Sequence, residues 1–315
     1  MSKVIVTGAA GFLGSFLSEA LLEDGHHVVG VDNFFRGKKE NLPTHDNFIF
    51  YEADLVTQAE AFRNIVLEEE PDIVYHYAAI NGTKYFYDIP FQVLDDNVKM
   101  TQNVLSSIAG TEVKKVVYAS SSEVYGHNPP VPTPEDEFII LNAQADRDSY
   151  ASSKALGEFY VMTFCKQNNI DYLIVRPFNT YGPRMDNTEY GQVIPEFIRK
   201  INRDEDFTII GSGSQTRSFC YVEDHAKIVS RLGDSAKNEI INVGAGEELT
   251  ISKLALVIHE LMDAQFNPVY LPERPNDTKR RQPDITKIME RYPDYKFVSL
   301  LGGLEKTILW YKEKK

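Results

Sequence analysis

A tyrosine and a lysine four residues apart, Tyr150 and Lys154, have the spacing in this sequence that most suggests chemistry. In a helix, residues at this spacing project from one face, one turn apart. A free tyrosine has a pKa of about 10 and is a poor base at neutral pH. A nearby positive charge favours the phenolate and lowers that pKa. The pair therefore predicts a base that takes a proton from an alcohol as hydride leaves its carbon, although such pairs also occur by chance on exposed helices.

A glycine-rich turn near the N-terminus predicts a bound dinucleotide that could accept the hydride. The β-branched run Val4–Thr7 leads into Gly8-Ala9-Ala10-Gly11-Phe12-Leu13-Gly14, followed by a periodic helical segment and the apolar run 28–31, which ends in Asp32. Strand, glycine turn, helix, strand and acid form the first unit of a dinucleotide-binding fold. The glycines let a helix N-terminus approach the pyrophosphate, and the acid accepts hydrogen bonds from the adenosine ribose. We expect a nicotinamide dinucleotide, whose oxidised ring adds positive charge beside Tyr150.

The choice between NAD and NADP depends on two charged residues after the second strand. Asp32 repels a 2′-phosphate and so favours NAD, whereas Arg36 could swing round to pair with such a phosphate. We expect NAD. Asp54 follows the third predicted strand and either accepts from the adenine amino group or caps a helix. Ala78 and Ala79 are small enough to let a cofactor pass close to the backbone.

Strands and helices alternate along the first part of the chain. Strands are predicted over 4–7, 28–31, 48–51, 73–77, 116–120 and 172–176, and helices over 91–109 and 150–165. This alternation predicts an α/β fold with a Rossmann-type doubly wound parallel sheet. After Pro177 the elements are shorter. We expect an NAD-binding Rossmann domain over 1–178, with 222–243 added to it, and a smaller, interleaved α/β substrate-binding C-terminal lobe over 179–315.

Composition restricts the class of protein. The 315 residues are 43% hydrophobic and 25% charged, which is ordinary for a soluble globular protein. A net charge of −13 argues against nucleic acid or an anionic membrane as a partner. Cys165 and Cys220 provide no disulfide framework, which fits a reducing cytosol. No apolar run approaches the roughly 20 residues of a membrane-spanning helix, and the first strand leaves no room for a signal peptide, so we expect a cytoplasmic protein.

Seven motifs in order carry a family resemblance. They are Gly8-x-x-Gly11-Phe12-x-Gly14, Asp32-Asn33, Ser120-Ser121-Ser122-Glu123-Val124-Tyr125-Gly126, Tyr150-x-x-x-Lys154, Arg176-Pro177-Phe178-Asn179-x-Tyr181-Gly182-Pro183, Gly211-x-Gly213-x-Gln215-x-Arg217-x-Phe219-x-Tyr221-x-x-Asp224 and Asn242-Val243-Gly244. Together they resemble the extended short-chain dehydrogenase/reductase family, in its NAD-dependent nucleotide-sugar epimerase, dehydratase and decarboxylase branch. The resemblance covers nearly the whole chain.

The resemblance implies a tightly held NAD and a nucleoside-diphosphate sugar, UDP-linked first, that is oxidised at carbon 4 and receives its hydride back in one cycle. Tyr150 would be the base on the 4-hydroxyl, and Lys154 would lower its pKa and hold the nicotinamide ribose. Ser121 would hydrogen-bond the same hydroxyl, although it could also be a turn residue at a strand end. The implied cofactor-binding residues are Gly8, Gly11, Phe12, Leu13, Gly14, Asp32, Asn33, Arg36, Asp54, Leu55, Ala78, Ala79, Tyr150, Lys154 and Pro177.

Substrate-binding candidates come from a loop and three later residues. Asn81-Gly82-Thr83-Lys84 follows a predicted strand, at the sheet edge where open α/β sheets bind ligands. Asn179 and Arg217 match family positions that contact the diphosphate or its nucleoside, and Arg274 matches a second phosphate-binding arginine. A guanidinium fork suits a diphosphate, although any one arginine could be a solvated surface charge.

The pair Ser122-Glu123 bears on the reaction. Glu123 could remove the acidified carbon-5 proton of a 4-keto sugar, or it could be structural. Dehydratases of the branch carry an Asp-Glu pair whose aspartate protonates the leaving 6-hydroxyl, and Ser122 is too weak an acid for that. A 4-epimerase needs no carbon-5 base. Glucuronate decarboxylases carry a Ser-Glu pair, but the loop Ala79-Ile80-Asn81-Gly82-Thr83 differs from the Pro-Ala-Ser-Pro type expected in them.

We therefore expect a nucleotide-sugar 4-epimerase or a related 4-keto-forming enzyme first and a UDP-glucuronate decarboxylase second. A non-catalytic NAD-binding regulator is the alternative of another class, and such a protein is expected to lose Tyr150 or Lys154, both of which are present. The resemblance also implies a homodimer through the helix of Tyr150 and the helix over 91–109. Phe159, Tyr160, Met162 and Thr163 could supply its contacts or belong to the core.

Overall fold

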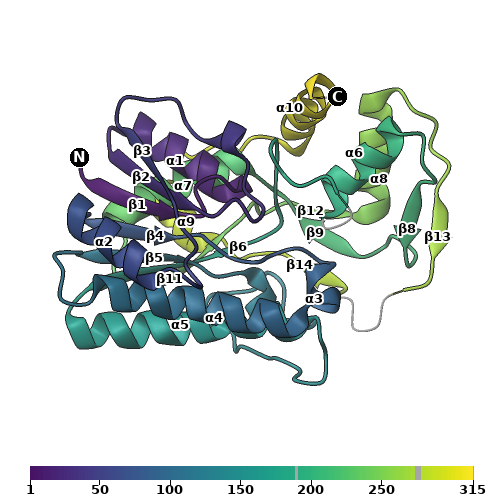
Figure 1. Ribbon diagram of the computed structural model, residues 1–315. Helices are drawn as coiled ribbons and strands as arrows, with labels where there is room; N and C mark the ends of the chain where they lie inside the picture. The colour runs from purple at the N-terminus through teal and green to yellow at the C-terminus, as the bar shows by residue number, and fades with distance from the viewer. Residues whose placement is uncertain (189–190, 274–277, 315) are drawn as a thin grey trace.

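A sheet of seven parallel strands forms the centre of the larger lobe in the computed structural model, which describes residues 1–188, 191–273 and 278–314 (Figure 1). Its order is β11-β6-β5-β4-β1-β2-β3. The strands are β1 (Lys3–Thr7), β2 (His27–Asp32), β3 (Phe48–Glu52), β4 (Ile73–His76), β5 (Lys115–Ala119), β6 (Asp171–Pro177) and β11 (Glu239–Val243). The strand order reverses between β1 and β4, and the crevice at such a point is where these sheets bind ligands. The predicted Rossmann-type fold is confirmed.

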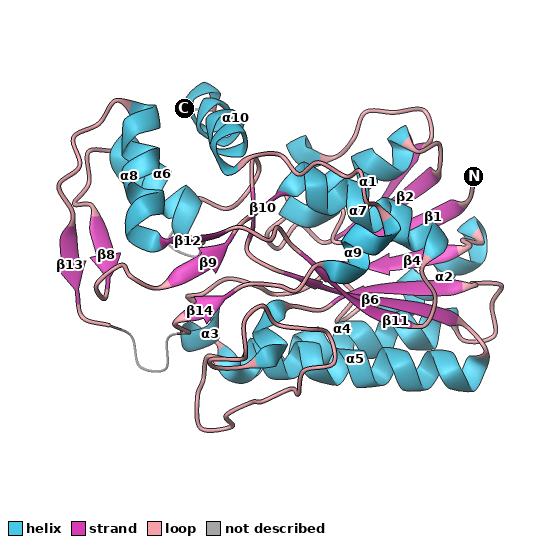
Figure 2. Cartoon of the chain, turned by 180° about the vertical axis from the view of Figure 1, so that it is seen from behind, coloured by secondary structure: helices cyan, strands magenta, loops and turns pink. Residues whose placement is uncertain are grey.

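Helices cover both faces of this sheet (Figures 1 and 2). One face carries α2 (Ala59–Glu69), α4 (Pro90–Ile108) and α5 (Asp148–Asn168), whose apolar side chains include Phe62, Val104 and Val161. The opposite face carries α1 (Phe12–Glu23), α7 (Val222–Ser235) and α9 (Thr286–Arg291), which contribute Leu17, Leu232 and Ile288. Because both faces are buried, the strands are continuous apolar runs rather than alternating ones.

The smaller lobe has its own apolar cluster, which includes Phe197, Phe207, Leu254 and Ile308. It contains α6 (Val193–Asn202), α8 (Ile251–Met262) and α10 (Leu300–Glu313). Its strands are β7 (Thr180–Tyr181) with β10 (Cys220–Tyr221), β8 (Thr208–Ile210) with β13 (Val269–Leu271), and β9 (Thr216–Ser218) with β12 (Glu248–Thr250) and β14 (Arg280–Arg281). The chain returns from this lobe through α7 and β11 to the large sheet. The domain division at residue 178 stays a prediction.

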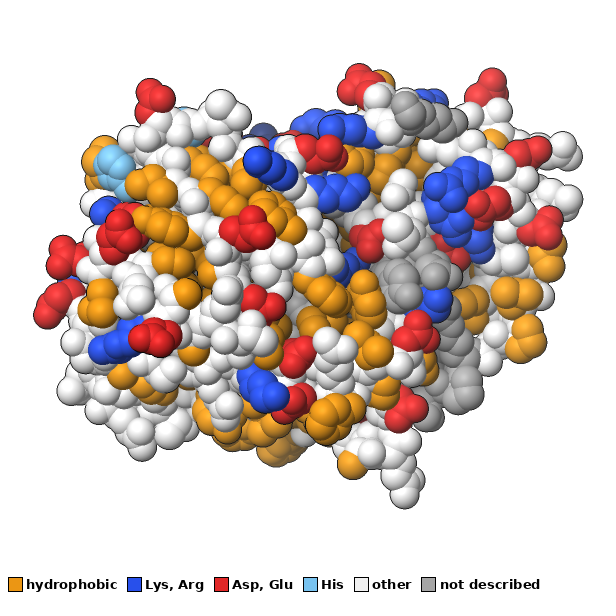
Figure 3. All heavy atoms as spheres, in the orientation of Figure 1, with side chains coloured by type: hydrophobic (Ala, Val, Ile, Leu, Met, Phe, Trp, Pro, Cys, Tyr) orange, Lys and Arg blue, Asp and Glu red, His pale blue; other side chains and the backbone are white. Residues whose placement is uncertain are grey.

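The long predicted elements agree with the structure to within a few residues. The helix expected over 91–109 is α4, and the one expected over 150–165 is α5, which begins two residues earlier. Four short helices of the described residues were not predicted: η1 (Lys39–Asn41), α3 (Tyr85–Asp88), η2 (Ser122–Tyr125) and α9 (Thr286–Arg291). Among the described residues, no helix has both the length and the apolar character to cross a membrane. Basic, acidic and hydrophobic side chains are intermixed on the face seen in Figure 3.

Gly157 allows α5 to lie close against β5. A Cβ atom at this position would lie 2.0 Å from the hydroxyl oxygen of Tyr118, whose side chain is buried in the sheet. One turn earlier, Lys154 Nζ donates to the carbonyl of Ala119 over 2.8 Å. The glycine therefore sets the distance at which α5 presents its chemistry-bearing face to the end of β5.

We predict that Gly157→Ala lowers the free energy of unfolding by about 1–3 kcal/mol, because the added methyl overpacks a filled contact. Urea unfolding followed by circular dichroism measures this. The matched control is Gly302→Ala in α10, where the nearest atom to a new Cβ is the hydroxyl oxygen of the N-cap Ser299 at 3.3 Å; its stability should change by less than about 1 kcal/mol. Equal stabilities of the two variants would contradict the close-contact argument.

Candidate active site

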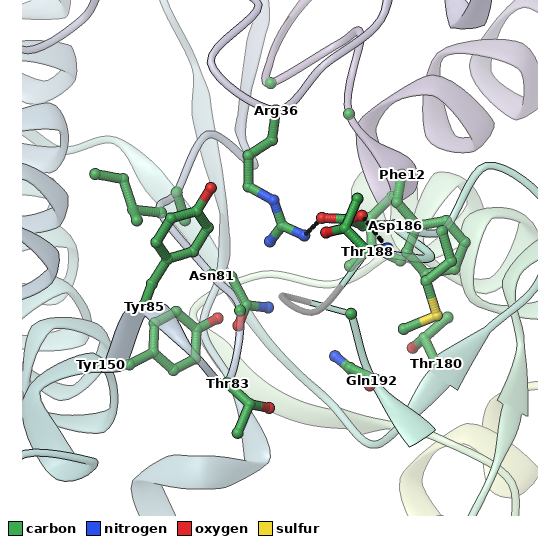
Figure 4. Close-up of a pocket in the computed structure, with 18 of the residues that line it drawn as sticks. Phe12, Arg36, Asn81, Thr83, Tyr85, Tyr150, Thr180, Asp186, Thr188 and Gln192 are labelled. Atoms are coloured by element: carbon green, nitrogen blue, oxygen red, sulfur yellow. Dashed lines mark hydrogen bonds and ion pairs between the residues drawn. The ribbon is translucent and has the colours of Figure 1, made fainter. Parts of the chain in front are cut away.

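A cavity of about 1550 Å³ extends along the carboxyl ends of the sheet strands and into the smaller lobe. Every site residue predicted from the sequence except Arg274 lines it: Gly8, Gly11, Phe12, Leu13, Gly14, Asp32, Asn33, Arg36, Asp54, Leu55, Ala78, Ala79, Asn81, Gly82, Thr83, Lys84, Ser121, Ser122, Glu123, Tyr150, Lys154, Pro177, Asn179 and Arg217. Arg274 lies outside the described residues. Figure 4 shows Tyr85, Tyr150, Asn81 and Thr83 on one side of this cavity and Asp186, Thr188 and Gln192 on the other.

The glycine turn has the shape that a dinucleotide requires. Gly8 has a φ of +73°, and a Cβ atom at Gly14 would lie 2.0 Å from the carbonyl oxygen of Gly8. α1 begins at Phe12, and its N-cap Gly11 offers no side-chain acceptor to the first-turn N–H groups. These groups line the cavity and suit a pyrophosphate. The residues of this turn therefore fit the predicted cofactor.

The acids at the ends of β2 and β3 hold loops as well as lining the cavity. Asp32 accepts hydrogen bonds from the backbone N–H groups of Ala10 (3.0 Å) and Phe34 (2.7 Å), and its burial raises the pKa of this carboxyl. Asp54 accepts from the N–H of Val56 (2.7 Å) and from the Asn33 amide (3.1 Å). α2 has its N-cap at Gln58, so Asp54 stabilises a turn before the helix rather than capping it.

Tyr150 and Lys154 are both buried at the end of the sheet. Burial lowers the pKa of Lys154 to about 7, and the Glu158 carboxylate opposes this effect. The Lys154 ammonium lies 5.9 Å from the centre of the Tyr150 ring and 5.0 Å from that of Tyr118. The two side chains therefore share one desolvated space, as their spacing predicted.

The pKa of Tyr150 is raised, mainly by burial and then by the charge of Glu123. A side-chain hydrogen bond with Ser121 and the positive charge of Arg36 act in the opposite direction. The predicted lowering of the Tyr150 pKa by Lys154 stays a prediction. Phe86 stacks on the Tyr150 ring with centroids 4.9 Å apart and planes 14° apart, and so fixes its orientation.

A buried polar network supports this end of the sheet from behind. Glu158, one turn after Lys154, accepts from Ser120 Oγ (2.5 Å) and from Arg176 Nε (2.8 Å) and Nη2 (2.7 Å). The Arg176 guanidinium also lies 4.6 Å from the ring centre of Tyr125. Because the ion pair is bidentate and almost fully buried, it ties α5, β5 and β6 together beside the serine cluster.

Glu123 is paired with arginines from distant parts of the chain. Both oxygens of its carboxylate accept from Arg281, and Arg147 Nη2 lies 3.7 Å from Oε1. Burial raises the pKa of Glu123, but the charges of Arg281 and Arg147 outweigh it and lower the pKa to about 2. Ser122 is buried in the same short helix, η2, and the Ser121 hydroxyl caps it by accepting from the N–H of Glu123 over 3.2 Å. Ser121 therefore combines the predicted turn position with a place beside Tyr150.

The candidates of the smaller lobe line the far end of the cavity. Asn179 donates from its side chain to the carbonyl of Ser218 over 3.0 Å, which ties the segment after β6 to β9. Arg217 in β9 donates to the carbonyl of Thr216 over 2.8 Å. The structure thus brings both to the cavity that Tyr150 shares.

Known proteins resemble this chain over nearly all of it. Residues 4–244 match the model of the NAD dependent epimerase/dehydratase family. The chain belongs to this family. A UDP-N-acetyl-α-D-glucosaminuronate decarboxylase of Bacillus cytotoxicus is 34% identical over 99% of this chain and 98% of its own length. UDP-glucuronic acid decarboxylase 1 of Danio rerio is 35% identical over 99% of this chain and 73% of its own length. The solved UDP-glucose 4-epimerase of Thermotoga maritima with UDP-glucose has 30% identity and a TM-score of 0.91, and 99% of each chain is covered.

Family membership confirms the prediction of an NAD-dependent enzyme of the epimerase, dehydratase and decarboxylase branch. This chain is therefore an enzyme of the NAD-dependent epimerase/dehydratase family. The narrower preference for a 4-epimerase is not confirmed, since the curated relatives named above are decarboxylases and the solved structure is an epimerase.

Sequence reasoning missed several residues of the site. Phe86 and the arginines at 147 and 281 were not predicted, and neither was Asn97. The Asn97 side chain accepts from the N–H of Ile80 (2.7 Å) and donates to Ser153 (3.1 Å), so it fixes the loop after β4 against α5. Of these residues, only Arg147 had a signal in the sequence, because it lies three residues before Tyr150 and so close to it on a helix.

We predict that Tyr150→Phe folds, retains NAD and loses about 10²- to 10⁴-fold in turnover, because it removes only the proton-accepting oxygen. Turnover is measured by product NMR, and NAD by its absorbance after release from the denatured protein. The control is Tyr160→Phe, the same change on the exposed part of α5. Turnover of Tyr150→Phe close to that of the control would exclude Tyr150 from the mechanism.

Proposed function

We propose that this protein is an NAD-dependent decarboxylase of a UDP-linked uronic acid, acting through a 4-keto intermediate. The observation that carries the proposal is the ionised Glu123, which Arg281 and Arg147 surround beside Tyr150. A cation-rich end of the cavity suits a substrate with a carboxylate at carbon 6. The two decarboxylases similar to this chain support this substrate class.

In the proposed mechanism, Tyr150 takes the proton of the sugar 4-hydroxyl, aided by its hydrogen bond with Ser121. The glycine turn before α1 would hold NAD, which would supply the hydride acceptor for carbon 4 and the donor for its later reduction. Lys154, whose pKa burial lowers to about 7, would position the nicotinamide ribose. Once carbon 4 is a ketone, the carbon 5–carbon 6 bond breaks, carbon dioxide leaves, and the electron pair moves onto the ketone oxygen as an enolate. Protonation at carbon 5 then restores a ketone for reduction.

The charge state of Glu123 argues against 4,6-dehydration. A carboxylate whose pKa is about 2 is a weak base and a poor acceptor for a carbon-5 proton. Ser122 adds no acid for a leaving hydroxyl. Loss of carbon dioxide needs neither group. In a β-keto acid, the electrons of the breaking carbon–carbon bond pass to the neighbouring ketone as carbon dioxide leaves. Glu123 and the two arginines would instead orient the uronate, so we assign Glu123 a positioning role.

A 4-epimerase is the second candidate. The loop that begins Ala79-Ile80-Asn81-Gly82-Thr83 lines the sugar end of the cavity and differs from the loop type expected in the decarboxylases. The similarity to the Thermotoga maritima epimerase also favours it. An epimerase would use the same Tyr150 and would return the hydride to the opposite face of the ketone.

The deciding experiment incubates the purified protein with UDP-glucuronate, its N-acetylated counterpart, UDP-glucose and UDP-N-acetylglucosamine. We expect a UDP-pentose or its N-acetylated form, with carbon dioxide, from a uronate alone, and Tyr150→Phe should give no product. NMR identifies the sugars. A carbon-4 epimer with carbon 6 retained would replace the decarboxylase by the epimerase, and a 4-keto-6-deoxy sugar would overturn both.

A homodimer through α4 and α5 is our proposal for the assembly. Phe91 (78% exposed) on α4 and Phe159 (61% exposed) on α5 are large apolar side chains open to solvent. Tyr160 and Thr163 are also exposed, whereas Met162 packs against the core. Helices α4 and α5 lie side by side along one surface in both views, so they present one continuous face (Figures 1 and 2).

We predict that Phe159→Asp converts a dimer into a monomer at micromolar concentration, because it places a charge in an apolar interface. Sedimentation velocity measures the change. Leu309→Asp, on the exposed side of α10 in the other lobe, should leave the dimer intact. A wild-type protein that sediments as a monomer would dispose of the interface.

A further inference from the structure

The geometry points to a clasp of two interlobe ion pairs, Arg36–Asp186 and Arg184–Glu19, that closes over the dinucleotide crevice and slows release of the cofactor. Glu19 and Arg36 belong to the larger lobe, and Arg184 and Asp186 belong to the segment that follows β7 in the smaller lobe. The inference rests on the proposed function in one respect, since hydride that must return to the same sugar requires a cofactor that stays bound.

The first pair crosses the cavity. Arg36 Nη2 donates to Asp186 Oδ2 over 2.7 Å, between residues 150 positions apart, and Figure 4 shows this contact spanning from the loop after β2 to the opposite wall. The Arg36 guanidinium also lies 5.6 Å from the ring centre of Tyr85. Asp186 is anchored in turn, because its Oδ1 accepts from the N–H of Thr188 over 2.8 Å. Burial raises the pKa of Asp186, but the hydrogen bonds from Thr188 and then the hydrogen bond and charge of Arg36 outweigh it and lower that pKa.

The second pair joins the same segment to the first helix. Arg184 Nη2 donates to Glu19 Oε1 over 2.7 Å, and its guanidinium stacks 4.4 Å from the ring centre of Phe16. Arg184 lines the cavity, and its buried Nη1 has no hydrogen-bond partner among the described residues. A buried donor of this kind is costly unless an acceptor such as a phosphate oxygen meets it.

The base of the clasp is rigid on the cofactor side. Gly37, next to Arg36, packs so closely that a Cβ atom would lie 2.7 Å from Ala10 Cβ and 2.8 Å from Asp32 Oδ1. The N–H of Lys38 and the Asn41 amide both donate to the carbonyl of Ala10, over 3.0 and 2.9 Å. Arg36 is therefore fixed to the glycine turn itself, and the two ion pairs tie residues 184–186 to elements that flank that turn.

The test measures cofactor release without any sugar, so its failure is separate from failure of the proposed reaction. NADH bound to the protein is displaced by excess NAD, and the fluorescence decay gives the release rate. We expect Asp186→Asn to release NADH about fivefold faster, the change that corresponds to roughly 1 kcal/mol for a partly buried pair. Glu19→Gln should act in the same direction.

The sign of the Asp186→Asn effect decides between two roles of Arg36. If Asp186 only competed with the cofactor phosphates for this arginine, its loss would slow release, and that result would overturn the clasp. The charge-swapped double variant Arg36→Asp/Asp186→Arg rebuilds the ion pair and should restore the release rate to within about twofold, which no direct contact of Arg36 with a phosphate could do. Failure of the swap in a variant whose thermal unfolding is normal would also overturn the clasp.

The matched control is Asp171→Asn. It breaks the Lys237–Asp171 ion pair, whose length is 2.8 Å and whose carboxylate has the same 28% side-chain exposure as Asp186, at residues that do not line the cavity. Its release rate should equal that of the wild type. A control that releases NADH as fast as Asp186→Asn would show that loss of any such pair loosens the fold, and the clasp would be rejected.

Discussion

The close contact of α5 with the end of β5 is the constraint on which the rest of the site depends. Gly157 lets the helix approach Tyr118, and this approach brings Lys154 Nζ to the carbonyl of Ala119. One turn further, Glu158 joins Ser120 and Arg176 in a buried ion pair. Because these contacts fall on one face of one helix, they fix the height of α5 along the sheet. Tyr150, on the same helix, then lines the cavity at the carboxyl ends of the strands.

Burial strengthens the electrostatic interactions of this site, and it also disfavours the charged forms of its side chains. Desolvation raises the pKa of Tyr150 and lowers that of Lys154 to about 7, so both neutral forms are favoured. Two groups favour the tyrosinate: Ser121, the N-cap of η2, through a hydrogen bond, and Arg36, in the loop after β2, through its charge. The environment of the proposed base therefore depends on side chains from three separate elements.

The sequence was sufficient for features that depend on local pattern and insufficient for contacts between distant side chains. Buried parallel strands are recognisable apolar runs, and the turn at Gly8–Gly14 requires glycines, so the sheet and the cavity wall were predicted. Arg281, which donates to Glu123, and Asp186, which accepts from Arg36, lie 158 and 150 residues away from these partners, and no spacing rule relates them. The short helix α3 was missed because four residues give little periodicity, although it carries the ring that stacks on Tyr150.

In the proposed function, the reaction that follows oxidation at carbon 4 depends on the charges beside Tyr150 rather than on Tyr150 itself. Tyr150 has the same role, oxidation at carbon 4, in both of the reactions proposed above. A proton-abstracting carboxylate would have to keep a pKa nearer neutrality, and two arginines hold Glu123 far below that value. The same arginines can share their donors between Glu123 and a second carboxylate. The two arginines thus weaken Glu123 as a base and can attract the carboxylate of a uronate. Both effects favour the proposed decarboxylation, in which the substrate's own carboxylate leaves as carbon dioxide.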